Sequence, residues 1–225
     1  ELRAYYKKWY RPDLQAIIVV GDVNVDQVEA TIKKMFADVP APVNPAKREQ
    51  VSVPDNDLPL ISIAKDKEAS NTILYIFYKH DKLPNDLNRT IAGLVKDYIH
   101  QICASIMDER FDDILHQANP PFIYAGTFEG DFFVAKTKDS FTGVVVCKEG
   151  TVEDGIANLL REMERARQFG FTETEYNRAR AEYLRQLESA YNERDKRKNE
   201  EYVNEYVRHF LDKEPIPGIE NEYAI

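Results

Sequence analysis

Histidine is the residue type in this chain best suited to metal or acid–base chemistry, and its spacing limits that chemistry. The chain has four histidines, His80, His100, His116 and His209. His116 follows Asp112 by one helical turn, and His209 follows Glu205 in the same way, so each pair could offer a metal two ligands. Dedicated zinc sites use three or four protein ligands. The spacing therefore favours solvated helix surfaces over metal sites.

Neither the cysteines nor the glycine-bearing turn of the N-terminal region predicts a cofactor site. Cys103 lies in a helical pattern and Cys147 in a strand pattern, and two such residues form neither a disulfide framework nor a metal knuckle. We expect both to be buried thiols. The segment VVGDVN has a lone Gly21 followed by Asp22, without the glycine-rich cradle and lysine of a phosphate loop. A nucleotide site is not expected.

Composition predicts an ordinary soluble globular protein. The 225 residues are 43% hydrophobic, and 39 acidic against 30 basic residues give a net charge of −9. Nucleic acid is not an expected partner, because phosphate binding needs a concentrated positive face. No apolar run approaches the ~18 to 20 residues of a membrane span. The chain starts at Glu1 without an initiator Met or a signal-peptide pattern, which suggests that an upstream segment was removed or not included.

The first 40 residues predict a strand and a helix, followed by a linker. The apolar run Leu14 to Val20 is typical of a central strand covered on both faces. Asn24 is suited to cap a helix in which apolar residues recur at helical spacing up to Phe36, with Gln27 completing a capping box. The segment from 40 to 59 holds five prolines and almost no periodicity. It is therefore expected to be an extended linker.

The remainder predicts an α+β domain. Two strands are expected at 60–64 and 71–79, then a helix that starts at Pro84-Asn85 and ends before Asn119-Pro120. Three short strands at 122–128, 132–138 and 141–147 follow as an antiparallel meander. Helices then start at Thr151 and Thr172, the first closed by Gly170 and the second opened by a Thr172–Glu175 capping box. The second runs for about 40 residues, with a kink or break expected in the polar stretch 192–201. This order predicts helices packed on one face of a mainly antiparallel sheet.

Several separate segments resemble one protein family. YKKWYRPDLQAIIVVGD followed by VDQVEATIKKMF is similar to the closing helix, strand and helix of the catalytic domain in pitrilysin/insulinase zinc metalloproteases. IMDERFDDILHQANPPFIYAG and ERARQFGFTETEYNRARAEYLRQLESAYNERD resemble the body of the second domain in long, single-chain bacterial members. The order and spacing of these segments agree with the family over nearly the whole chain.

The resemblance implies a fold and a division of the chain. The fold is that of a two-layer, mitochondrial-processing-peptidase-like metallohydrolase domain. Residues 1–40 correspond to the end of the upstream catalytic domain, 41–59 to a linker and 60–225 to a second, non-catalytic α+β domain without its final strand and helix. The family signature H-x-x-E-H binds zinc in the first domain and supplies the general base. No two histidines here have that spacing. The resemblance therefore implies zinc in the full-length parent, none in this segment, and no catalytic residue in this segment.

One substrate-contact candidate follows from the resemblance. In the family's second and fourth domains an Arg-x6-Tyr element reaches toward substrate near the zinc. Aligning QANPPFIY with it keeps Tyr124 but places Gln117 where arginine would stand. A neutral amide lacks the forked, charge-assisted hydrogen bonding of a guanidinium. Tyr124 is thus a candidate wall residue of a peptide chamber, and ordinary strand packing is the competing interpretation.

Two functions remain open at this point. The first is a non-catalytic segment of a zinc metalloendopeptidase that hydrolyses peptides in a closed chamber, with a bacterial envelope or periplasmic location implied by exported relatives. The second is a structural or binding module from a metal-less relative, because core subunits of the mitochondrial bc complex resemble the same fold. We also expect that the strand at 14–20 could fill a vacancy in the sheet of 60–225, within one chain or as a strand swap between two chains.

Overall fold

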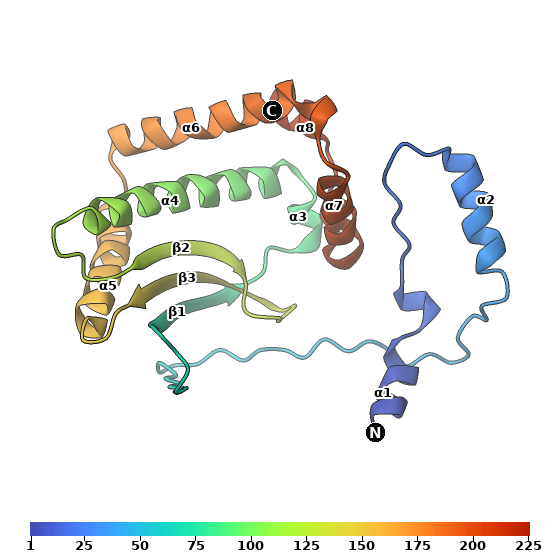
Figure 1. Cartoon of the computed structure of the whole chain (residues 1–225), viewed down its shortest axis with the longest axis horizontal. Coiled ribbons are helices and arrows are strands. Elements are labelled where there is room, and N and C mark those ends of the chain that lie inside the picture. Colours follow the sequence, from blue (N-terminus) through green and yellow to red (C-terminus); the bar gives the residue numbers. More distant parts are fainter. The chain divides into compact units, whose positions relative to one another are not determined.

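The computed structural model describes residues 1–225, apart from the side chain of Asn85 (Figure 1). The chain divides into two compact units. One consists of residues 50–186, and the other combines residues 1–49 with residues 187–225.

The unit of residues 50–186 contains the sheet. Its elements are β1 (Thr72–Asp81), α3 (Asn85–Asn88), α4 (Ile91–Leu115), β2 (Tyr124–Asp131), β3 (Lys138–Cys147), α5 (Val152–Phe169) and the first part of α6 (Glu173–Asn192). The strand order is β1-β3-β2, with both pairs antiparallel. Val145 of the central strand lies opposite Leu74 on one side and Ala125 on the other. This register places Leu74, Val145 and Ala125 on one face of the sheet.

The hydrophobic core lies between that face and two helices. α4 packs on β2 and α5 packs on β3. The buried side chains of this core are Met107, Phe111, Phe122, Ala125, Val145, Cys147, Leu159 and Met163. The rings of Phe111 and Phe122 meet edge to face with centroids 6.2 Å apart. α4 contributes because its apolar residues recur every three or four positions, and Thr90 begins it by accepting a hydrogen bond from the Ala92 amide at 3.2 Å.

α6 covers α4 on the side away from the sheet (Figure 1). Ala179 of α6 is buried against Ile102 and Ile106 of α4, with Tyr98 and Tyr183 at the margin of this cluster. Helices therefore cover only one face of the sheet. The expected α+β architecture, with helices on one face of a mainly antiparallel sheet, is confirmed.

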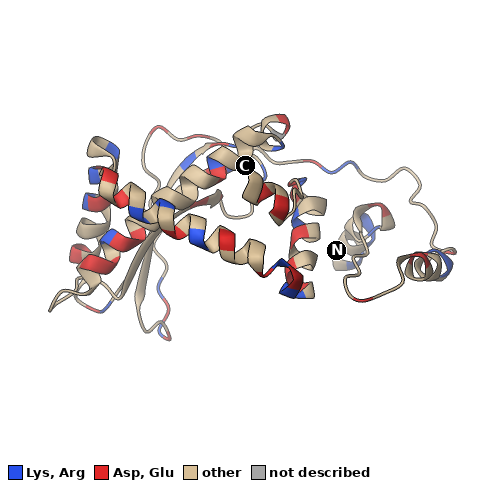
Figure 2. Ribbon diagram, turned by 90° about the horizontal axis from the view of Figure 1, so that it is seen from above, with Lys and Arg blue, Asp and Glu red and all other residues tan. Residues whose placement is uncertain are grey.

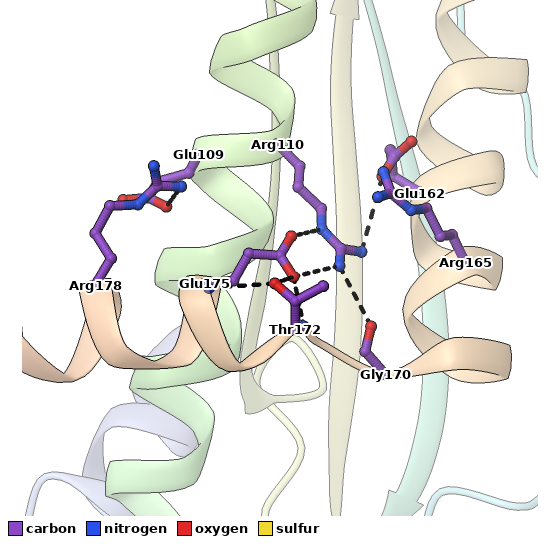
Figure 3. Close-up of polar contacts among 8 residues, drawn as sticks. All are labelled: Glu109, Arg110, Glu162, Arg165, Gly170, Thr172, Glu175 and Arg178. Atoms are coloured by element: carbon purple, nitrogen blue, oxygen red, sulfur yellow. Dashed lines mark hydrogen bonds and ion pairs between the residues drawn. The ribbon is translucent and has the colours of Figure 1, made fainter.

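A buried arginine ties α4 to the junction of α5 and α6 (Figure 3). Arg110 donates from Nε to Glu175 Oε1 at 2.6 Å and from Nη2 to Glu175 Oε2 at 3.0 Å. Its Nη2 also donates to the Gly170 carbonyl at 3.3 Å, and its Nη1 lies 3.9 Å from Glu162. The predicted capping box is present, because Glu175 Oε2 accepts from the Thr172 amide and Thr172 Oγ1 accepts from the Glu175 amide. We call this set of residues the Arg110 clasp.

The other unit consists of short helices and extended segments. Its elements are α1 (Leu2–Trp9), a 3-10 turn at Pro12–Leu14, α2 (Val25–Met35), the end of α6, a 3-10 turn at Arg194–Lys196, α7 (Asn199–Asp212) and α8 (Ile219–Ala224). Asn24 caps α2 as predicted, accepting from the Gln27 amide at 3.0 Å. Arg11 is buried and donates to the Ala46 carbonyl at 2.8 Å. The long C-terminal helix breaks where the polar stretch predicted, between α6 and α7.

Three strand predictions were wrong. Residues 15–20 and 60–64 form no strand, because no other strand among the described residues pairs with them. Ile17 and Val19 are half-exposed, which differs from the expected fully covered strand. Residues 132–137 are the loop between β2 and β3 rather than a separate strand. The two phenylalanines that suggested a strand there, Phe132 and Phe133, instead pack on Phe77 of β1 with ring centroids 5.5 and 4.7 Å away.

Candidate functional site

Two of the histidines bind backbone carbonyls. His116 follows α4, and its Nδ1 lies 2.7 Å from the Asp112 carbonyl oxygen. His209 has its Nδ1 2.6 Å from the Glu214 carbonyl oxygen. Both imidazoles therefore interact with main-chain oxygens near helix ends.

The sheet brings together a histidine and a glutamate that sequence reasoning did not pair. His80 of β1 and Glu129 of β2 lie 2.6 Å apart, Nε2 to Oε1, across the central strand. His80 Nδ1 is 3.0 Å from the Asp81 carbonyl oxygen. Burial lowers the pKa of His80, but the hydrogen bonds to Asp81 and Glu129, together with the negative charges of Glu129 and Asp139, raise it above its usual value. No sequence pattern signals the pair, because it depends on strand order.

Metal and thiol chemistry have little support within the described part of the chain. It holds no group of three or more His, Cys, Asp or Glu residues placed to bind a metal ion. Cys147 is buried as predicted, whereas Cys103 is only partly buried, and both thiols are free. Burial raises the pKa of each thiol, which reduces the reactive thiolate at neutral pH. Neither cysteine resembles an activated nucleophile.

Tyr124, the candidate from the sequence, begins β2 on the sheet face opposite the helices. Its neighbour Ala125 points into the core, so the alternation of a strand turns Tyr124 the other way. The side chain lies along the strand over Gly126, where a methyl group would stand 2.6 Å from the Tyr124 hydroxyl oxygen and 3.3 Å from Asp108 Oδ1. Burial and then Asp112 raise the pKa of Asp108, although its hydrogen bond to the Thr127 backbone lowers it. Tyr124 is thus half-exposed, with a partly buried carboxyl group nearby.

The face around Tyr124 is aromatic, and no helix of the described chain packs on it, although Val144 is buried and Phe77 is contacted by Phe132 and Phe133. We define the open sheet face as the side chains opposite the helices, namely Ile73, Tyr75, Phe77, Tyr124, Phe128, Val144 and Val146. Ile73, Tyr75 and Tyr124 are 55%, 51% and 52% exposed. Tyr75 stacks on Phe77 with centroids 5.7 Å apart. A row of rings and branched side chains on one face of a sheet suits contact with apolar side chains of another segment.

Gln117, aligned with the family's arginine position, does not complete a polar site with Tyr124. It follows α4, where its amide donates to the Ile114 carbonyl at 3.2 Å, and its side chain is exposed. The chain between the two residues passes through the core at Phe122. An exposed amide here supplies no fixed positive charge.

The helices carry both signs of charge along their length (Figure 2). On α5, Arg165 pairs with Glu162 at 3.2 Å and Arg167 pairs with Glu164 at 2.6 Å, each one turn away. Opposite charges at this spacing neutralise one another locally. Among the described residues, no helix is both long and apolar enough to cross a membrane.

Comparison with family models gives one match. Residues 1–183 match the model described as the peptidase M16 inactive domain. The match extends from α1 to about the middle of α6, and it includes the whole sheet and the Arg110 clasp.

Two curated relatives that match nearly the whole chain carry protease names. The chain is 29% identical over 226 residues to a "Zinc protease PQQL-like" protein of Arabidopsis thaliana, covering 98% of the chain and 20% of that protein. It is 21% identical over 225 residues to a "Probable zinc protease PqqL" of Escherichia coli, covering 100% of the chain and 24% of that protein. The chain thus spans about a fifth to a quarter of the length of these relatives.

A solved structure has the same fold. The periplasmic protease PqqL from Escherichia coli aligns with a TM-score of 0.78 at 18% identity, over 99% of this chain and 24% of that one. At this identity the likeness shows the fold alone. The fold agrees with the α+β class expected from the order of elements.

Proposed function

Because the chain belongs to the peptidase M16 family, the pitrilysin/insulinase proteases, we propose that it is a non-catalytic segment of a zinc-dependent metalloendopeptidase. The observation that carries the proposal is the match of residues 1–183 to the inactive domain of this family. The sequence agrees, since no two of its four histidines stand at the H-x-x-E-H spacing. In the full-length parent the zinc and the general base would then belong to another domain.

We assign the chain to two domains of that parent. Residues 1–40 close the catalytic domain, 41–59 form the linker and 60–225 form the second, non-catalytic domain. Support comes from the arrangement of helices on one side of the sheet, which leaves the other side free to face a substrate chamber. In this role the segment is a scaffold and a wall that selects peptides by size and shape.

Tyr124 is the residue that we propose to contact peptide. It is half-exposed at the start of β2, within the aromatic open sheet face. A ring with a hydroxyl at its end packs on apolar side chains and hydrogen-bonds to a peptide carbonyl or amide. Because Gln117 lacks the charge of the family's arginine, we assign Tyr124 to substrate binding rather than to transition-state stabilisation.

The cofactor, the substrates and the location of the full-length parent are proposed from its relatives. Relatives are named zinc proteases, so zinc would be the cofactor of the full-length parent and peptides its substrates. The Escherichia coli protein of the same fold is described as periplasmic. We propose a bacterial envelope or periplasmic location on that basis.

Self-association through a strand swap is part of the proposal. Residues 16–20 are apolar and belong to no strand, and Ile17 and Val19 are half-exposed, so this segment is free to pair with a sheet edge of a second copy. Sedimentation of the 225-residue chain at increasing concentration tests this, since a swap predicts a dimer and a monomer at all concentrations excludes it.

Zinc content and peptide cleavage of the full-length parent provide the main test. The expected result is about one zinc per chain and chelator-sensitive cleavage of a quenched peptide, with neither zinc binding nor cleavage by residues 1–225 alone. A full-length protein that binds no zinc and cleaves nothing would instead support the structural module of a metal-less relative. Tight zinc binding by residues 1–225 would refute both.

The role of Tyr124 has its own readout in the same assay. Replacing a group that binds ground state and transition state equally raises KM and leaves kcat unchanged. We expect Tyr124→Ala to raise KM about 5- to 30-fold, because about 1 to 2 kcal/mol of ring contact is lost. The matched control is Tyr206→Ala, at a tyrosine of similar exposure on α7. Equal kinetics for the two variants would assign Tyr124 to strand packing.

A further inference from the structure

Asp108 of α4 reaches the edge of the open sheet face beside Tyr124. In the order β1-β3-β2, β2 is an outer strand, and α4 packs on it (Figure 1). The Asp108 carboxyl group hydrogen-bonds to the Thr127 backbone of β2. A methyl group built on Gly126 would stand 3.3 Å from Asp108 Oδ1 and 2.6 Å from the Tyr124 hydroxyl oxygen. Two oxygens so close to one point are able to share a single nitrogen donor at hydrogen-bond distance.

This corner of the sheet carries negative charge without a neutralising cation. Within the described part of the chain, neither Asp108 nor Asp112, one helical turn further along α4, has an ion pair. The neighbouring Glu109 differs, because Arg178 neutralises it. A partly buried carboxylate without a counter-charge favours a charge-assisted hydrogen bond from a cation. The corner is therefore suited to bind a positively charged group.

An apolar row of side chains leads across the sheet to this corner. Ile73 of β1 and Tyr124 of β2 both lie opposite Val146 of the central strand, on the open sheet face. Ile73 and Tyr124 are half-exposed, and Val146 is partly buried between them. The row ends at the Tyr124 hydroxyl and the Asp108 carboxylate. A lysine or arginine side chain fits such a surface, because its methylene stem packs on apolar groups while its charged end stays at a polar partner.

From this geometry we propose that the corner binds a basic side chain of a peptide substrate and that Asp108 is the residue that selects lysine or arginine. The proposal rests on the peptide-binding role proposed above for Tyr124. The ammonium or guanidinium group donates to Asp108 Oδ1 and to the Tyr124 hydroxyl oxygen, and its stem lies on Val146. The Tyr124 ring offers the cation an aromatic face. An acidic side chain is excluded, because Asp108 and Asp112 repel it.

Cleavage of blocked, quenched peptides by the full-length parent tests the specificity. The peptides have one leucine at a time replaced by lysine. We expect lysine at one position to lower KM, and Asp108→Asn to raise KM for that peptide about tenfold without changing kcat or the kinetics of the all-leucine peptide. Asparagine keeps an oxygen for the Thr127 backbone but lacks the charge. The matched control is Asp113→Asn, at an exposed carboxylate of the same helix, which should change the kinetics of neither peptide.

Binding to the 225-residue chain separates this site from the proposed protease role. The amide chemical shifts of Gly126 and Thr127 are followed while an acetylated Leu-Lys-Leu amide, or its counterpart with norleucine in the centre, is added. We expect the lysine peptide to bind about tenfold more tightly, and Asp108→Asn to abolish the difference. Such binding, with a parent that cleaves nothing, would support the site and refute the proposed function. A parent that cleaves peptides without preferring lysine, or an Asp108→Asn variant that loses activity equally on both peptides, would refute the site.

Discussion

The Arg110 clasp gives the sharpest quantitative prediction. Arg110 and Glu175 have side chains only 8% and 16% exposed, and they share two hydrogen bonds. Arg110→Ala leaves the Glu175 carboxylate buried without its cation, whereas Glu162 keeps its ion pair with Arg165. Removing one partner of a buried pair costs about 3 to 5 kcal/mol. We expect that loss in the free energy of unfolding at pH 7.

The lowered pKa of Glu175 supports a loss of similar size in the free energy of unfolding. The hydrogen bond to Arg110, followed by those to Thr172, lowers this pKa from 4.5 to about 2, against the opposing effect of burial. A shift of this size corresponds to about 3 kcal/mol. Because folding lowers the pKa, the stabilisation is present above pH 4.5 and is lost as the pH falls toward 2. The difference in the free energy of unfolding between the wild type and Arg110→Ala should therefore be about 2 kcal/mol smaller at pH 3 than at pH 7.

Urea unfolding followed by far-UV circular dichroism measures both effects. The matched control is Arg178→Ala, which removes the nearby but exposed ion pair with Glu109 on the same two helices (Figure 3). An exposed pair contributes at most about 1 kcal/mol. Equal destabilisation of the two arginine variants, or a gap independent of pH, would show that the clasp does not stabilise α4 against the α5–α6 junction.

Three further predictions concern single positions. Gly170→Ala should lower the free energy of unfolding in urea by about 1 kcal/mol, because Gly170 has φ of +67° at the end of α5. The control Gly130→Ala should lower it by less, because Gly130 has no positive φ and no atoms lie near the added methyl group. Because the pKa of His80 is raised on folding, its stabilisation should be present below pH 6.5 and decrease as the pH rises through the folded pKa; Glu129→Gln should weaken this dependence in unfolding titrations. Cys147 should react with a thiol reagent only on unfolding, and rapid labelling of the native chain would contradict its burial.

Local sequence signals predicted the helices well because their determinants are local. Asn24 caps α2, Thr172 and Glu175 form the capping box, and Gly170 ends α5 in the left-handed region. Each signal acts within one or two turns of its own helix. The break between α6 and α7 also lies in the polar stretch that predicted it.

Strand prediction failed at segments where the presence of a pairing strand decides whether a strand forms. The apolar runs at 15–20 and 60–64 have the composition of strands, but a strand exists only when another backbone pairs with it. Phe132 and Phe133 have strand-like side chains yet lie in a loop, because Phe77 of a distant strand provides their contact.

The sequence by itself determined the helices, the class of fold, the family and the lack of paired metal-binding histidines, because these depend on residue types at short spacing. Only the tertiary structure decided which residues meet across long separations. The partnership of Arg110 with Glu175, the contact of His80 with Glu129 and the exposure of Tyr124 follow from strand order and helix packing. The physical reason is that such contacts depend on closing long loops, whose outcome is fixed by the whole core rather than by local sequence.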